Sequence, residues 1–187
     1  MANRNTQGFG LIPAGTLGQT PATSGTGKYK IDAGYTTTIY HGGAVASNAG
    51  YIIDGQTTDA PILGVLNGIF YNAATTLKPT FANFYKQPIT PANSEDVDAF
   101  VFDNPQQQYV VATDAAVAQA GYLETYDMNT SAGSTTTGKS SATLDIGDTS
   151  ADAASFRLLR SAEDPENDEN AAYRSVVVCI NLIELQS

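Results

Sequence analysis

Short runs of β-branched, aliphatic and aromatic residues recur from Tyr29 to the end of the chain, separated by clusters of Gly, Asn, Asp or Pro. Such runs predict β-strands. The expected strands are Ile31–Tyr40, Gly50–Ile53, Ile62–Tyr71, Phe81–Tyr85, Val97–Phe102, Tyr109–Thr113, Gly121–Tyr126, Ala142–Ile146, Ser155–Arg160 and Arg174–Leu185. Helical signals are weak, and Asp114–Ala120 is the only candidate helical turn. Many short strands predict an all-β fold, a compact antiparallel barrel or sandwich.

Three sites have residues that favour a turn, each for a physical reason. Asp54-Gly55 and Asn67-Gly68 supply residues that tolerate a positive φ, and Asp103-Asn104-Pro105 removes a backbone donor from a strand. The polar stretch Thr130–Ser141 suits a hairpin tip, and residues 163–170 form an acidic loop before the last strand.

Residues 1–28 differ from the rest of the chain. They are rich in Gly, Thr, Ser, Asn and Pro, with one apolar island over Phe9-Gly10-Leu11-Ile12-Pro13. Such a segment buries too little apolar surface to offset its ordering entropy, so we expect it to be mobile alone or held by a partner through the island. The alternative is a tail without a role. We divide the chain into an extended N-terminal arm, residues 1–28, and a single β domain, residues 29–187.

The charge distribution limits the classes of partner that we expect the protein to bind. The 187-residue chain has a formal net charge of -10, whereas residues 1–31 hold three cations, Arg4, Lys28 and Lys30, and no acid. An acidic body repels a phosphate backbone, so we expect no direct nucleic-acid partner. No run approaches the roughly 18 apolar residues of a membrane span, and the N-terminus lacks the apolar part of a secretory signal, so we expect neither membrane insertion nor secretion by that route.

Candidate catalytic and metal-binding residues are few. The only cysteine, Cys179, lies in an apolar run and is expected to be a buried, inert thiol. The only histidine, His41, precedes Gly42-Gly43 and is expected in a surface turn. One His and one Cys do not make the usual zinc site, and the acidic loop lacks calcium-site spacing. We therefore expect no enzyme activity, metal or cofactor, with an acidic-site hydrolase as a minor alternative resting only on the abundant carboxylates.

One nucleotide-binding pattern does occur. Gly133–Ser140 matches the phosphate-loop spacing Gly-x-x-x-x-Gly-Lys-Ser. That motif functions between a buried strand and a helix N-terminus, whose amides hold the phosphates. Here a polar segment precedes it, and Ser141–Ile146 alternates like a strand. The context argues against nucleotide binding.

Several stretches, in order, carry a resemblance to a known family. They are Gly50-Tyr51-Ile52, Ile62–Tyr71, Pro79–Tyr85, Val101–Pro105 with Gln108-Tyr109, Thr137–Ser140 with Leu144-Asp145, Phe156–Leu159, and Val176–Asn181. From about Gly34 onward the chain resembles the capsid decoration, or cement, proteins of tailed bacteriophages. No single stretch is specific, and their order is the evidence. The resemblance carries no catalytic residues.

The resemblance implies a virion structural protein on the capsid surface, assembled in the host cytoplasm. Its partners would be the major capsid protein and copies of itself, the latter in a homotrimer. We expect the arm to act as the anchor, adding its backbone to a sheet edge on the shell or a neighbouring copy. The expected capsid-binding residues are Arg4, Phe9, Leu11, Ile12, Pro13, Lys28 and Lys30. The alternative function is a glycan-binding or adhesive β module, which ten tyrosines permit.

Overall fold

A computed structural model describes residues 3, 5–17, 25–56, 61–129, 133–147, 155–181 and 184–186. Its strands are β1 (Ile12–Thr16), β2 (Gly27–Ile31), β3 (Ala44–Asn48), β4 (Tyr51–Asp54), β5 (Gly64–Asn72), β6 (Pro79–Ala82), β7 (Val97–Phe102), β8 (Gln107–Ala112), β9 (Thr125–Tyr126), β10 (Met128–Asn129), β11 (Thr143–Leu144), β12 (Phe156–Ser161) and β13 (Ser175–Ile180). The 3-10 turns are η1 (Ala92–Ser94), η2 (Gln119–Gly121) and η3 (Glu184–Gln186). The prediction of an all-β fold is confirmed.

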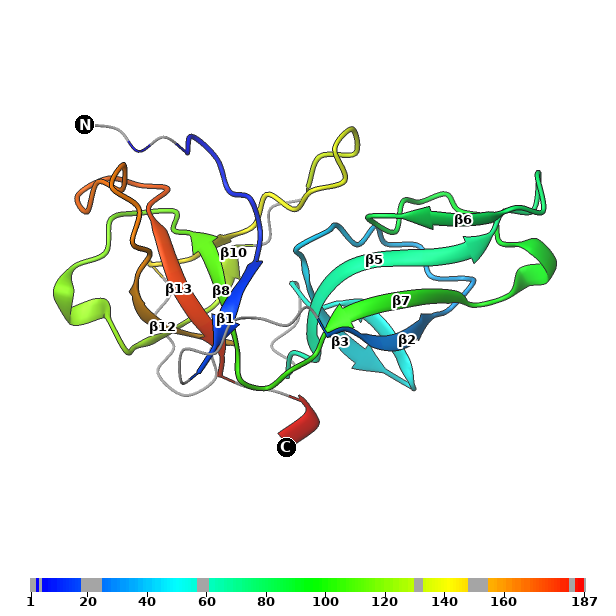
Figure 1. Cartoon of the computed structure of the whole chain (residues 1–187), viewed down its shortest axis with the longest axis horizontal. Coiled ribbons are helices and arrows are strands. Elements are labelled where there is room, and N and C mark those ends of the chain that lie inside the picture. Colours follow the sequence, from blue (N-terminus) through cyan, green and yellow to red (C-terminus); the bar gives the residue numbers. More distant parts are fainter. Residues whose placement is uncertain are drawn as a thin grey trace.

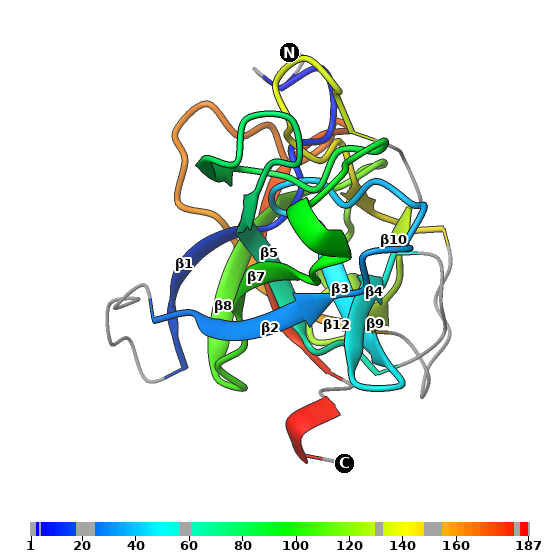
Figure 2. The same cartoon turned by 90° about the vertical axis from the view of Figure 1, so that its right-hand side faces the viewer.

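Two antiparallel sheets lie side by side along the long axis of the molecule (Figure 1). The five-stranded sheet has the order β1-β8-β13-β12-β9, and β10 pairs separately with β11. The six-stranded sheet has the order β2-β7-β5-β3-β4, with β6 paired to the outer part of β5. Viewed from the end, β2 and β4 lie in front of the other sheet (Figure 2). The described strands form open, packed sheets, which fits a sandwich rather than a closed barrel.

Two hydrophobic cores hold this arrangement. The first core lies on the inner face of the five-stranded sheet and includes Tyr109, Phe156 and Val176, all fully buried. The other lies on one face of the six-stranded sheet. The adjacent residues Val65 and Leu66 of β5 enter different cores, because side chains alternate across a strand. β5 therefore joins the two cores, and each fully buried aliphatic side chain contributes about 1.5–3 kcal/mol.

A β-bulge in β5 corrects one turn prediction. Asn67-Gly68 lies inside the strand, where the register with β7 shifts between Leu66 and Gly68. The extra residue, Asn67, places both Leu66 and Ile69 on the core side of the sheet. The Asn67-Gly68 pair therefore does not provide a residue with positive φ. It provides a bulge and, at Gly68, a position without a side chain.

The prediction of a strand over Ile31–Tyr40 is wrong. Only Ile31 belongs to a strand, and a turn follows in which the Gly34 amide donates to Asp32 Oδ1 at 2.7 Å and the Tyr35 amide donates to the Asp32 carbonyl at 3.0 Å. Aspartate commonly closes such turns with its own side chain. The segment then crosses the second core as a loop, with Ile39 bridging to Tyr85.

The structure confirms two further predictions, the turn at Asp103-Asn104-Pro105 and the burial of Cys179. The turn at Asp103-Asn104-Pro105 is confirmed, since it joins β7 to β8 and the Gln107 amide donates to the Asn104 carbonyl at 2.9 Å. Cys179 is buried as predicted, and burial raises the pKa of its thiol. Strands β1, β2 and β3 were not predicted as strands. Within the described ranges, no helix combines the length and apolar character needed to cross a bilayer.

Candidate functional site

His41, the only histidine of the chain, has a structural role. His41 is half-buried rather than in a surface turn, and its Nδ1 lies 2.9 Å from the Asn67 carbonyl oxygen. Because that carbonyl can only accept, Nδ1 donates the hydrogen bond and supports the bulge. In the part of the chain that the structure describes, no three His, Cys, Asp or Glu side chains are grouped to hold a metal ion.

The Gly133–Ser140 segment also has a structural role. It folds as a turn in which the Gly138 amide donates to the Ser134 carbonyl at 2.7 Å, with Gly138 at φ 72°. Its far end pairs with His41, and strand β11 follows instead of a helix. The segment therefore lacks the strand, loop and helix that hold phosphates in nucleotide-binding proteins.

The N-terminal arm is docked on the protein's own body. β1 pairs antiparallel with β8 and forms the edge of the five-stranded sheet (Figure 1). Before it, the Leu11 amide donates to the Gly42 carbonyl at 2.8 Å, and the Leu11 side chain enters the first core with 2% exposure. Gly8 lies so close to the Ser141 carbonyl that a Cβ there would come within 2.1 Å. The backbone of residues 12–16 thus already completes a sheet within the same chain.

Docking divides the expected anchor residues into two groups. Phe9 and Pro13 are partly buried and Leu11 is buried, so these three contact the protein itself. Ile12 is the exception, with half of its side chain exposed on the outer side of β1. Pro13 and the bulge after it also discourage further strand addition at this edge. Among the apolar anchor residues, Ile12 is therefore the one most exposed to another molecule.

The expected cationic anchors differ as well. Lys28 and Lys30 project from β2 and both bind the Asp98 carboxylate, at 2.8 and 2.6 Å. The hydrogen bond to Asp98 raises the pKa of Lys30. Burial alone would raise the pKa of Asp98, but both lysines outweigh it and lower that pKa. The stability from this group is complete above the pKa of an unfolded aspartate and is lost as pH falls through the folded value. Arg4 lies outside the described residues.

The sequence did not predict an aromatic cluster on the open face of the six-stranded sheet. We call Phe70, Phe81 and Phe100, with Lys28, Lys30 and Asp98, the aromatic face. Phe70 lies opposite Phe81 in the β5–β6 register and opposite Asp98 in the β5–β7 register, so these side chains share one side of the sheet. Phe81 is 63% exposed. Phe70 and Phe100 are partly buried, and the exposed Phe81 ring beside them makes this face a candidate interaction surface.

Gly68 lets this cluster form. The rings of Phe81 and Phe100, from the strands on either side of β5, have centroids 6.0 Å apart. A Cβ on Gly68 would come within 2.9 Å of Phe81 Cζ and 3.0 Å of the Ala82 carbonyl. The missing side chain therefore leaves room for the Phe81 ring over β5.

Replacing Gly68 with alanine should displace the Phe81 ring and lower the free energy of unfolding by about 1–3 kcal/mol, the usual cost of inserting a methyl group into a packed position. Chemical denaturation would measure the loss, and ring-proton shifts of Phe81 and Phe100 would report the displacement. Gly25→Ala is the matched control, because Gly25 has open space around it and no positive φ. Gly50→Ala is less suitable because Gly50 has φ 87°. Unchanged ring shifts in Gly68→Ala would contradict this packing.

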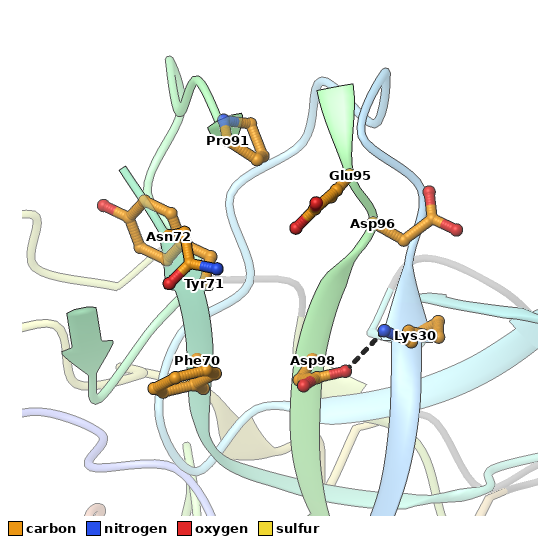
Figure 3. A pocket seen from close by; sticks show the side chains of 8 residues that line it. All are labelled: Lys30, Phe70, Tyr71, Asn72, Pro91, Glu95, Asp96 and Asp98. Atoms are coloured by element: carbon orange, nitrogen blue, oxygen red, sulfur yellow. Dashed lines mark ion pairs between the residues drawn. The ribbon is translucent and has the colours of Figure 1, made fainter. Parts of the chain in front are cut away.

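A shallow cavity of about 250 Å³ adjoins the aromatic face. Figure 3 shows Phe70 and the Lys30–Asp98 ion pair on one side, with Glu95 and Asp96 above them and Asn72 across from Glu95. The cavity lies between β5 and the start of β7, so acidic groups border the lysine-bearing end of the aromatic face. It holds no nucleophile paired with a base.

Only part of these surfaces could be predicted from the sequence. The sequence predicted Lys28 and Lys30 as contact residues but not the strand β2 that carries them, and their partner Asp98 lies far along the chain. No protein-family model, curated protein or solved structure matches this chain.

Proposed function

We propose that this protein is a virion structural protein that binds the outside of a phage capsid and stabilises it. The support is the ordered resemblance to capsid decoration proteins. A second support is that the all-β body presents exposed apolar side chains on its surface. The observation that carries the proposal is Ile12, an exposed aliphatic side chain on an edge strand that the adjacent buried Leu11 fixes to the core.

Docking changes how the arm would act. Residues 12–16 are already ordered, so binding would not incur the full entropy cost of fixing a free arm. Leu17, 44% exposed directly after β1, is a second exposed apolar side chain, and we call Ile12 and Leu17 together the apolar ridge. The contact would be made by side chains of a preformed ridge, since the backbone hydrogen bonds of β1 are formed with β8. Repetition of this contact over a symmetric shell would add avidity.

Replacing Ile12 with aspartate should weaken capsid binding by roughly tenfold or more, because a charge would be buried in an apolar contact. Co-sedimentation with empty expanded capsids of the phage that encodes the protein measures this. Leu123→Asp is the matched control: it adds the same charge at a 62% exposed leucine two residues after η2 and should bind normally. Equal binding by wild type and Ile12→Asp would refute the role of the ridge.

A further inference from the structure

The aromatic face has different chemistry on its two flanks. Across the open side of the six-stranded sheet the strand order is β2, β7, β5 and β6. β2 contributes Lys28 and Lys30, with 60% and 51% of their side chains exposed, and β6 contributes Phe81. Lysines therefore lie on one flank and the most exposed aromatic ring lies on the other.

This order makes the face complementary to itself. A two-fold axis that runs parallel to the strands, between two facing sheets and above the gap between β7 and β5, places the β6 flank of one copy over the β2 flank of the other. Phe81 of each copy would then meet the lysines of its partner twice in the same interface, as an isologous dimer requires. Lysine stems pack on aromatic faces, and the ammonium group is attracted to the ring.

The charge distribution favours this face for self-contact. The chain has a net charge of -10, so two copies repel each other over most of their surfaces. On the aromatic face, two lysines accompany Asp98, whose side chain is only 14% exposed. The two lysines outnumber the one carboxylate within the face, although Glu95 and Asp96 border its lysine-bearing end. Two acidic chains therefore meet less like-charge repulsion at this face than over the rest of their surfaces.

We propose that the aromatic face is a two-fold contact between two copies of this chain, with Phe81 of each copy against Lys28 and Lys30 of the other. This pairing uses residues distinct from Ile12 and Leu17, so it does not rest on capsid binding. The outer end of the six-stranded sheet projects away from the five-stranded sheet, which leaves room for a second copy there (Figure 1).

Sedimentation velocity of the full chain over a concentration series tests this contact. The wild type should show a reversible monomer–dimer equilibrium. Phe81→Asp should weaken dimerisation by roughly 30-fold or more, the loss expected for one interface hot spot. Leu123→Asp, with the same change of charge at a similarly exposed residue, should dimerise like the wild type.

A second variant covers the case in which Phe81→Asp does not fold. Lys28→Ser leaves the Lys30–Asp98 pair in place and should weaken dimerisation by roughly fivefold, since two symmetric cation–aromatic contacts are lost. Circular dichroism would confirm that each variant is folded. A wild type that stays monomeric, a trimer, or a dimer unaffected by Phe81→Asp and Lys28→Ser would overturn the proposal.

Discussion

Replacing Leu11 with alanine should lower the free energy of unfolding by about 2–5 kcal/mol, as for other large-to-small substitutions in a core. Its side chain is 2% exposed and packs in the first core, although it belongs to the segment that the sequence marks as a free arm. Chemical denaturation measures the change. Ile12→Ala is the control, because it removes an aliphatic side chain of the same size from the next position, half exposed, and should change stability by about 0.5 kcal/mol or less.

The comparison between these two neighbours tests whether the arm is docked in solution. If the arm were mobile, both alanine variants would leave stability near that of the wild type. A loss confined to Leu11→Ala would show that the arm is part of the folded body. Similar small effects at both positions would contradict the docked arrangement and restore a free arm as the capsid anchor.

Arg174→Ala should cost a similar amount, about 2–5 kcal/mol, since it removes one of the largest fully buried side chains. The Arg174 guanidinium is 3.0 Å from Glu169 Oε1 and lies over the Tyr122 ring, 5.6 Å from its centroid. Together these contacts join β13 to the acidic loop and to the segment after η2. Thermal and chemical unfolding would measure the loss.

A second substitution separates packing from charge at this position. Arg174→Met keeps most of the buried volume but removes the cation, and replacing a buried ionic group by a well-packed apolar one is often neutral or stabilising. We expect Arg174→Met to be clearly more stable than Arg174→Ala. Equal losses in the two variants would show that the ion pair with Glu169, and not packing, accounts for the contribution of Arg174.

The sequence predicted the fold class because most strands carry strong β-branched and aromatic runs. It did not predict β1, since Ile12–Thr16 contains Pro and Gly, and only pairing with β8 makes it a strand. It placed a strand over Ile31–Tyr40 because β propensity there is high, but an Asp32 turn and the packing of Ile39 on the second core override that propensity.

The aromatic face could not be predicted for a related reason. Its three phenylalanines belong to three different strands, and only strand order and register bring Phe70, Phe81 and Phe100 together. Alternation within one strand shows which residues share a side, but it does not show which strands are neighbours. At Asn67-Gly68 the sequence predicted a turn, whereas the structure has a bulge inside β5.

The temperature at which capsids break tests the central claim most directly. Empty expanded capsids of the proposed parent phage would be heated with increasing amounts of purified protein, and shell rupture would be followed by light scattering. Capsid decoration predicts saturable binding that raises the rupture temperature, with a smaller rise for Ile12→Asp than for Leu123→Asp. An unchanged rupture temperature at saturating protein would contradict the proposal that this chain cements a capsid.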